Sequence, residues 1–142
     1  MVKQVSIFLE NRSGRLYEVT HLLANNKIDI KALSVADTSD FGILRLIVDQ
    51  TEKAEEVLRK EKWTVSITDV IAVEVEDKPG GLAKVLKIFD ENKMNVEYMY
   101  SYLCKNPDKA VMIFRFDNNP VVIEKLKSTD IKMIGVKDLN NL

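Results

Sequence analysis

Glu10-Asn-Arg-Ser-Gly-Arg-Leu16 is the stretch on which the fold assignment depends, because it recurs as Glu76-Asp-Lys-Pro-Gly-Gly-Leu82. The correspondence continues along the chain, and Ile28-Asp29-Ile30 falls on Met94-Asn95-Val96. Apolar positions and turn glycines coincide in both copies, although few residues are identical. A repeat of this kind indicates that one structural unit is written twice.

The two copies share one pattern of apolar residues, which predicts strand, helix, strand, strand, helix, strand in each. Alternating apolar residues indicate half-buried strands, and apolar stripes at helical spacing indicate amphipathic helices. In the first copy we expect strands near 5–9, 28–37, 43–49 and 63–69 and helices near 13–25 and 52–61. In the second we expect strands near 71–75, 94–103, 110–117 and 131–137 and helices near 79–91 and 120–128. Turns are expected at 39–42 and 105–108.

This βαββαβ order predicts the α+β fold class. With right-handed crossovers each copy forms a ferredoxin-like unit with strand order 4-1-3-2 and both helices on one face. No Gly, Ser or Pro linker separates the copies, so we expect two domains that meet directly, residues 1–69 and 70–142. Strands two and four are open edges. The units are therefore expected to pair edge to edge into an eight-stranded antiparallel sheet with four helices on one face.

Composition excludes several classes of function. The chain has 142 residues, of which 46% are hydrophobic, and 21 Lys and Arg balance 22 Asp and Glu, which argues against a nucleic-acid partner. A single cysteine, Cys104, and a single histidine, His21, argue against a disulfide framework, a zinc site and most catalytic triads. No apolar run is long enough for a signal peptide or a membrane span. We expect a cytoplasmic protein that is not an enzyme and needs no metal or cofactor.

The repeat, its element order and the Gly-x-Leu turn before the first helix together resemble the ACT domain. This domain is a small-molecule regulatory module attached to many enzymes of amino-acid metabolism. The resemblance covers the whole chain as two ACT-like units. It implies a stand-alone allosteric sensor that binds a free amino acid and acts on a regulated enzyme or regulator in trans.

The resemblance also implies which residues bind the ligand. In the family, domains pair side by side, and the amino acid lies between the loop before the first helix of one domain and the second strand of its neighbour. The better site would then comprise Asn11, Arg12, Ser13, Gly14, Arg15, Leu16, Asn95 and Tyr98. A second, weaker site would comprise Asp77, Lys78, Gly80, Gly81, Leu82 and Asp29, where two carboxylates face one ligand.

The physical chemistry of these residues supports the same site. A glycine-containing turn that opens a helix offers backbone N–H groups to an α-carboxylate. An amide side chain such as that of Asn11 can accept from an ammonium and donate to a carboxylate. The alternative for this loop is a plain turn with Ser13 as the N-cap.

Two further features leave alternatives open. Tyr98, Tyr100 and Tyr102 share one face of a strand, as a packing stripe or as part of a side-chain pocket. The apolar residues Phe8, Ile43, Ile47 and Ile113 on the outer sheet face predict a homodimer interface. The alternative function is accordingly a protein-interaction or dimerisation module with a vestigial ligand site.

Overall fold

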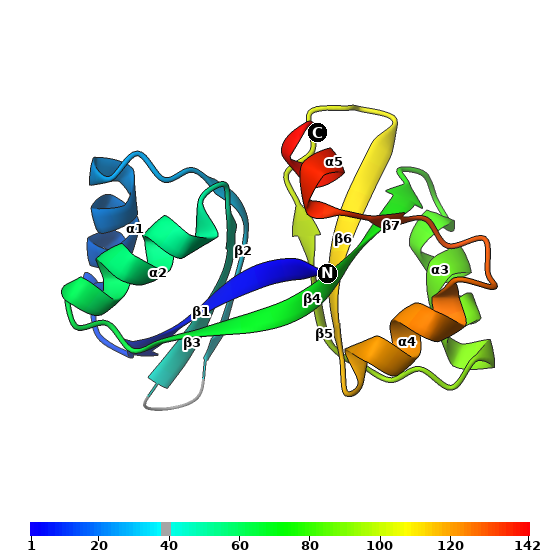
Figure 1. Cartoon of the computed structure of the whole chain (residues 1–142), viewed down its shortest axis with the longest axis horizontal. Helices are drawn as coiled ribbons and strands as arrows, with labels where there is room; N and C mark the ends of the chain where they lie inside the picture. The colour runs from blue at the N-terminus through cyan, green and yellow to red at the C-terminus, as the bar shows by residue number, and fades with distance from the viewer. Residues whose placement is uncertain (38–40) are drawn as a thin grey trace. The chain divides into compact units, whose positions relative to one another are not determined.

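Two units make up the chain, and each contains one copy of the repeat (Figure 1). The computed structural model describes residues 1–37 and 41–142, so that Ser39 and Asp40 of the first expected turn lie outside the described residues. The first unit comprises Lys3–Thr68, and the second comprises Asp69–Leu142 together with Met1–Val2.

The first unit has the strand order that the sequence predicts. Its elements are β1 (Val2–Glu10), α1 (Arg15–Asn25), β2 (Ile30–Asp37), β3 (Phe41–Val48), α2 (Thr51–Lys60) and the start of β4 (Val65–Glu76). The order is β2-β3-β1-β4, with β3 antiparallel to both β1 and β2. Next to the start of β4, the Phe8 N–H donates to the Thr64 carbonyl at 3.0 Å.

The core of the first unit lies between this sheet and its two helices (Figure 1). Side chains alternate between the faces of a strand, so every second residue of β1 and β3 points to the helices. The buried members are Val5, Ile7, Leu9, Val19, Leu23, Ile28, Leu44, Leu46, Val48, Ala54, Leu58 and Val65. Both helices therefore cover one face, as predicted, and the β1–α1 loop lies at the end of the sheet.

The second unit repeats this arrangement with a more aromatic core. Its elements are the rest of β4, α3 (Gly81–Glu91), β5 (Val96–Tyr102), β6 (Lys109–Phe116), α4 (Asn119–Leu126), β7 (Met133–Ile134) and α5 (Val136–Asn140). The strand order is β7-β4-β6-β5, again as predicted. Phe89 of α3 meets Phe114 and Phe116 of β6 edge-on, with ring centroids 5.0 and 5.1 Å apart.

The described residues differ from the prediction in the number of elements. The last strand expected for the first copy and the first strand expected for the second form one strand, β4, so seven strands are described instead of eight. No Gly or Pro interrupts residues 65–76, and the β-branched residues there favour a continuous strand. There are five helices instead of four, because α5 takes the end of the strand expected at 131–137. Edge-to-edge pairing of the copies stays a prediction.

The register of β5 and β6 decides on which sheet face the tyrosine stripe lies. Tyr100 pairs with Ile113 and Tyr102 with Val111, on the face opposite α3 and α4. The buried Tyr102 hydroxyl donates to the Leu139 carbonyl of α5 at 3.2 Å. The stripe therefore does not pack under α3 and α4, because α5 contacts it on the other face.

The predicted homodimer surface is wrong in two of its residues. Ile113 is 0% exposed and Ile47 is 3% exposed, so neither can contact a second chain. Phe8 is 52% exposed, as expected, and Ile43 is half-buried. The outer position on a strand does not ensure exposure, because other parts of the chain can cover that face.

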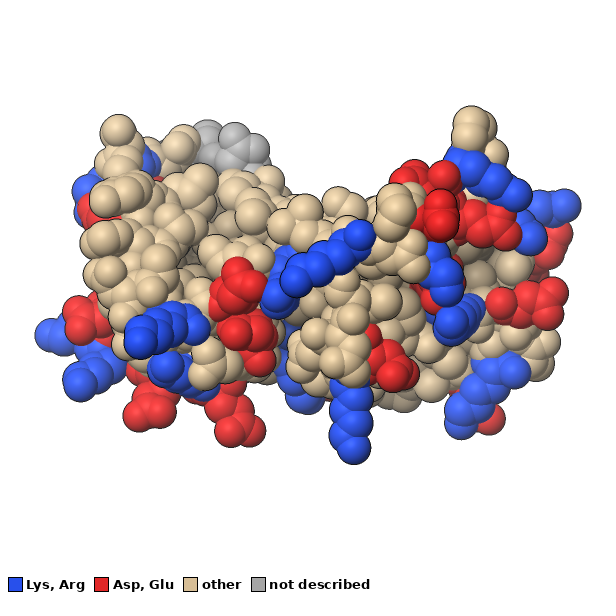
Figure 2. Space-filling model, turned by 90° about the horizontal axis from the view of Figure 1, so that it is seen from above, with Lys and Arg blue, Asp and Glu red and all other residues tan. Residues whose placement is uncertain are grey.

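Charged side chains of both signs are interspersed over the face shown in Figure 2. Lys and Arg lie beside Asp and Glu on that face, and no broad area of it carries one sign of charge. Among the described residues, no helix has the length and apolar character of a membrane span.

Candidate functional site

The loop between β1 and α1 and its counterpart between β4 and α3 have the same backbone hydrogen bonds. The Arg12 N–H donates to the Glu10 carbonyl at 2.8 Å, and the Lys78 N–H donates to the Glu76 carbonyl at 3.0 Å. The sequence repeat is therefore also a structural repeat of the candidate ligand loop.

A glycine in the left-handed conformation begins both helices. Gly14 has a φ of 90° and Gly80 a φ of 87°, a region that side chains with a Cβ rarely adopt. Each is the N-cap residue, and no side chain caps either helix. The alternative with Ser13 as N-cap is therefore wrong, and no side-chain cap competes with a ligand carboxylate for the N–H groups that follow the first one in each helix.

The two loops differ at the residue after this glycine. Gly81 follows Gly80, and a Cβ on Gly81 would collide with the Glu76 carbonyl oxygen. Arg15 is the equivalent residue in the first copy, and its N–H reaches the Arg12 carbonyl at 3.4 Å, against 3.0 Å for Gly81 and Lys78. The first loop is thus slightly wider, which admits a side chain where the second loop excludes one.

A pocket of about 350 Å³ lies beside the first loop, and we call it the loop pocket. It is lined by Leu9, Glu10, Asn11, Arg12, Arg15, Leu16, Val35 and Gly42. Four predicted ligand residues therefore come together around one cavity, while Ser13 and Gly14 are exposed in the loop beside it. Its size falls in the range of small-molecule sites.

Sequence reasoning missed the strand residues of this pocket. Val35 of β2 and Gly42 of β3 complete the loop pocket, and Gly42 pairs with Leu9 at the end of β1. Val35 is 46% exposed although it belongs to a strand. The signal was weak, since a valine in a strand pattern normally indicates core.

Arg15 turns its side chain away from solvent. Its Nη1 donates to the Glu18 carboxylate at 2.7 Å, and its guanidinium carbon lies 3.9 Å from the centre of the Trp63 ring. Within the described residues, its buried Nε has no hydrogen-bond partner. The guanidinium is therefore held in one orientation and keeps unused donor capacity.

The predicted residues of the weaker site surround the second loop. Asp77, Lys78 and Gly80 are exposed, Leu82 packs against the core, and Gly81 lines a smaller pocket of about 180 Å³. Glu76 accepts a hydrogen bond from Lys78 at 2.8 Å, which lowers the pKa of Glu76 and raises the pKa of Lys78. Charged side chains of the second loop thus already pair with each other.

The predicted residues of the second strands occupy different surroundings. The Asp29 N–H donates to the Asp49 carboxylate at 2.9 Å, and its own carboxylate lies 2.7 Å from Lys31 Nζ. Asn95 is exposed just before β5, and Tyr98 is half-buried within it. Asn95 and Tyr98 belong to the second unit and the Asn11 loop to the first. Their combination into one site stays a prediction.

Comparisons with known proteins agree with this architecture. A family model described as an ACT domain pair matches residues 1–142. The crystal structure of protein BT0572 from Bacteroides thetaiotaomicron is 42% identical, with a TM-score of 0.90 over 99% of this chain and 96% of that one. The ligand-free regulatory subunit of aspartate kinase from Thermus thermophilus shares the fold, with a TM-score of 0.64 at 13% identity over 90% of this chain and 91% of that one.

A curated protein is similar over about half of the chain. The acetolactate synthase small subunit of Haemophilus influenzae is 32% identical over 73 residues, which are 51% of this chain and 45% of that protein. The chain thus covers less than half the length of this relative.

Proposed function

The chain belongs to the ACT-domain family as an ACT domain pair, and on that premise we propose that it senses a free amino acid and regulates amino-acid metabolism. The family model covers a regulatory domain pair and not a catalytic domain. The similarity to an acetolactate synthase small subunit supports a regulatory role. We further propose that the protein acts in the cytoplasm, on an enzyme or regulator in trans.

The observation that carries this proposal is the glycine-capped helix start beside the loop pocket. The N–H groups of α1 that follow Arg15 have no side-chain cap and suit an α-carboxylate, and their effect is strengthened by the helix dipole. Asn11 lines the same pocket and offers an amide to the ammonium or the carboxylate. Leu16 and Val35 supply apolar surface for a side chain.

We propose that a second-strand residue from the other copy completes each site. Asn95 would complete the Asn11 loop, and Asp29 would complete the Asp77 loop. Asp29 is already paired with Lys31, and Glu76 in the second loop is paired with Lys78. The first combination offers two uncharged amides to a zwitterion, so we propose that it binds the ligand more tightly.

A thermal-shift screen against the free amino acids tests this function. A ligand that binds only the folded protein stabilises it by about 2.7 kcal/mol at a hundredfold excess over Kd. We expect one amino acid, or a small group of related ones, to raise the melting temperature by several degrees. If no amino acid shifts it at millimolar concentration, the sensor function is wrong.

Exposed apolar residues favour the alternative function, a protein-interaction or dimerisation module with a vestigial ligand site. Leu16, Tyr17, Leu33 and Val35 are between 44% and 68% exposed in the first unit. Such residues on one unit could mark a homodimer contact or a docking surface. This module would be favoured over the sensor if light scattering shows a dimer and no amino acid changes the melting temperature.

A further inference from the structure

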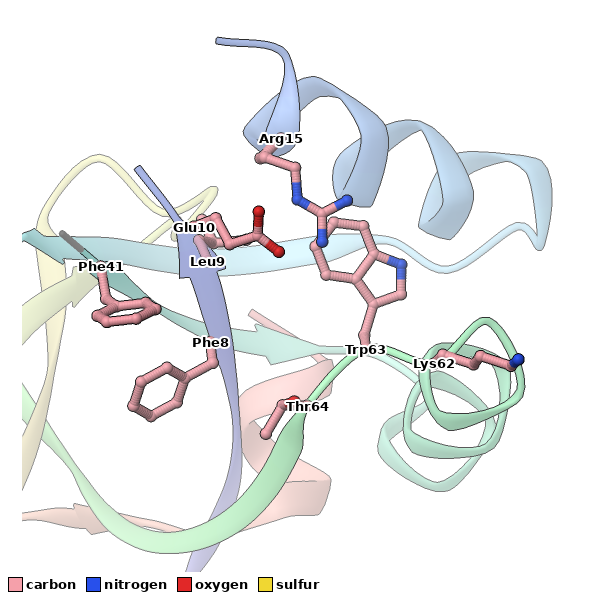
Figure 3. Close-up of a pocket in the computed structure, with 8 residues that line it drawn as sticks. All are labelled: Phe8, Leu9, Glu10, Arg15, Phe41, Lys62, Trp63 and Thr64. Atoms are coloured by element: carbon pink, nitrogen blue, oxygen red, sulfur yellow. The ribbon is translucent and has the colours of Figure 1, made fainter. Parts of the chain in front are cut away.

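A second pocket of the first unit lies on the Trp63 side of Arg15 (Figure 3). We call it the tryptophan pocket. It has a volume of about 290 Å³, and its lining includes Phe8, Glu10, Arg15, Phe41, Lys62 and Trp63. All of these residues belong to the first unit, so the pocket needs no contribution from the second. The function proposed above does not use Phe8, Phe41 or Trp63.

The cationic wall of this pocket is already in place. Figure 3 shows the Arg15 guanidinium over the Trp63 ring, where their separation of 3.9 Å indicates a cation–π contact. The contact holds the guanidinium in place, and its Nε has no acceptor in the part of the chain that the structure describes. A carboxylate that enters the pocket would meet a cation that Trp63 and Glu18 already orient, whereas the Lys62 ammonium points away from Arg15 (Figure 3).

The other walls are one carboxylate and two aromatic rings. The Glu10 carboxylate extends toward the Arg15 and Trp63 side of the pocket (Figure 3), and it forms an ion pair with the exposed Arg12 at 3.3 Å. Phe8 and Phe41 are 52% and 50% exposed, with ring centroids 6.1 Å apart at 63°. Half-exposed rings beside a cavity gain free energy when a ligand covers them.

We propose that the tryptophan pocket binds an α-amino acid with an aromatic or large aliphatic side chain. The carboxylate would face Arg15, the ammonium Glu10, and the side chain the rings of Phe8 and Phe41. The chemistry favours a zwitterion, because the pocket carries both signs of charge next to apolar surface. The two pockets share Leu9, Glu10 and Arg15, whereas the rings of Phe8, Phe41 and Trp63 line the tryptophan pocket and not the loop pocket.

The second copy does not offer an equivalent site. Gly81 replaces Arg15, and the corresponding pocket is lined by charged residues that include Glu74, Lys84 and Lys132. Lys132 Nζ lies 2.9 Å from the Glu74 carboxylate, so the charges there are paired with each other. We therefore expect one such site per chain.

Trp63 provides a direct readout, because it is the only tryptophan in the sequence. Its emission should change saturably when L-phenylalanine is titrated into the 142-residue protein. Two probes dissect the recognition. 3-Phenylpropionate lacks the ammonium and L-alanine lacks the ring, and each should bind at least about tenfold more weakly than L-phenylalanine.

Two substitutions and a control test the assignment of the walls. Glu10→Gln should lower the affinity for L-phenylalanine by about tenfold. It should change the affinity for 3-phenylpropionate by less than about twofold, because only the amino acid carries an ammonium. Phe41→Ala should lower the affinity for both L-phenylalanine and 3-phenylpropionate. Tyr17→Ala removes an exposed ring outside the pocket and should leave every affinity unchanged.

The outcomes separate this site from the loop pocket. Saturable heat in calorimetry without any change in Trp63 emission would place the ligand elsewhere, which overturns the tryptophan pocket but upholds the sensor function. Equal affinities for L-phenylalanine and 3-phenylpropionate, or no effect of Phe41→Ala, would also overturn the pocket. Binding that depends on Phe41 but not on Asn11 would uphold the pocket and contradict the loop site.

Discussion

At the scale of single residues, Gly81 is the glycine at which an added Cβ would meet the closest neighbour. A Cβ would collide with the Glu76 carbonyl oxygen, and backbone cannot give way as a flexible side chain can. Gly81→Ala should therefore lower the free energy of unfolding by about 2–3 kcal/mol. Urea denaturation measures this.

Gly135→Ala is the matched control for that substitution. Gly135 has a φ of −81°, and nothing lies within 4 Å of a Cβ built on it, so alanine should leave stability nearly unchanged. Equal losses in the two variants would show that the tight turn at Gly81 is not the cause.

The asparagines of the proposed better site should matter more than the corresponding aspartates. Asn11→Ala or Asn95→Ala should weaken the binding of the amino acid with the highest affinity by about 1–3 kcal/mol, since a buried ligand group loses its partner. That is about 5- to 150-fold in affinity. Asp29→Ala and Asp77→Ala should change affinity much less. Titration calorimetry on the four variants ranks them, and the reverse order would contradict the assignment.

Glu74 links stability to pH. Hydrogen bonds from Lys109 and Lys132, each at 2.9 Å, lower the pKa of this carboxyl from its usual value of 4.5. The unfolded chain takes up the proton at a higher pH than the folded chain does. The contribution of these ion pairs is therefore fully present above that usual value, and is lost as the pH falls through the lowered folded-state pKa.

Glu74→Gln should accordingly lower stability at neutral pH and flatten the acid limb of its pH dependence. Urea denaturation at a series of pH values measures both effects. Glu56→Gln, at an exposed glutamate of α2, is the control and should keep the wild-type slope. A Glu74 variant with the wild-type slope would refute the coupling.

At the scale of elements, the sequence predicts the order of helices and strands better than the residues at which they begin and end. The order of the first six elements of each copy is confirmed, and most boundaries differ from the expected ones by about two residues, because turn residues and helix caps decide them locally. The fusion of two expected strands into β4 was harder to foresee. The segment around Thr68 has no Gly or Pro, yet a change of partner strand along one continuous strand leaves no pattern in the sequence.

The helix α5 was missed because short helices owe their stability to packing and not to propensity. Leu139, 2% exposed, anchors it beside Tyr102. Leu139→Ala should therefore lower the free energy of unfolding by about 2–4 kcal/mol, through lost burial and a cavity. Val136→Ala, at a position that is 47% exposed on the same helix, should lower it by less than about 1 kcal/mol. Chemical denaturation distinguishes the two, and similar losses would mean that α5 is not anchored by Leu139.

At the scale of the whole molecule, the two copies keep one backbone design and differ in chemistry. The Asn26 side chain donates to the Leu22 carbonyl at 2.9 Å, and Asn92 donates to Ile88 at 2.8 Å. This agreement far from the loops explains why the repeat could be found from sequence. The candidate site was only partly predictable, because its loop is local whereas Trp63, which fixes Arg15, lies on a distant segment.

The central claim is that this ACT domain pair binds a free amino acid at the loop pocket beside Asn11, and calorimetric titration tests it most directly. The amino acid that gives the largest thermal shift is titrated into the wild-type chain and into the Asn11→Ala variant. The account predicts saturable heat for the wild type and an affinity about 5- to 150-fold weaker for the variant. Absence of heat with every amino acid at millimolar concentration, or the same affinity in both proteins, would contradict it.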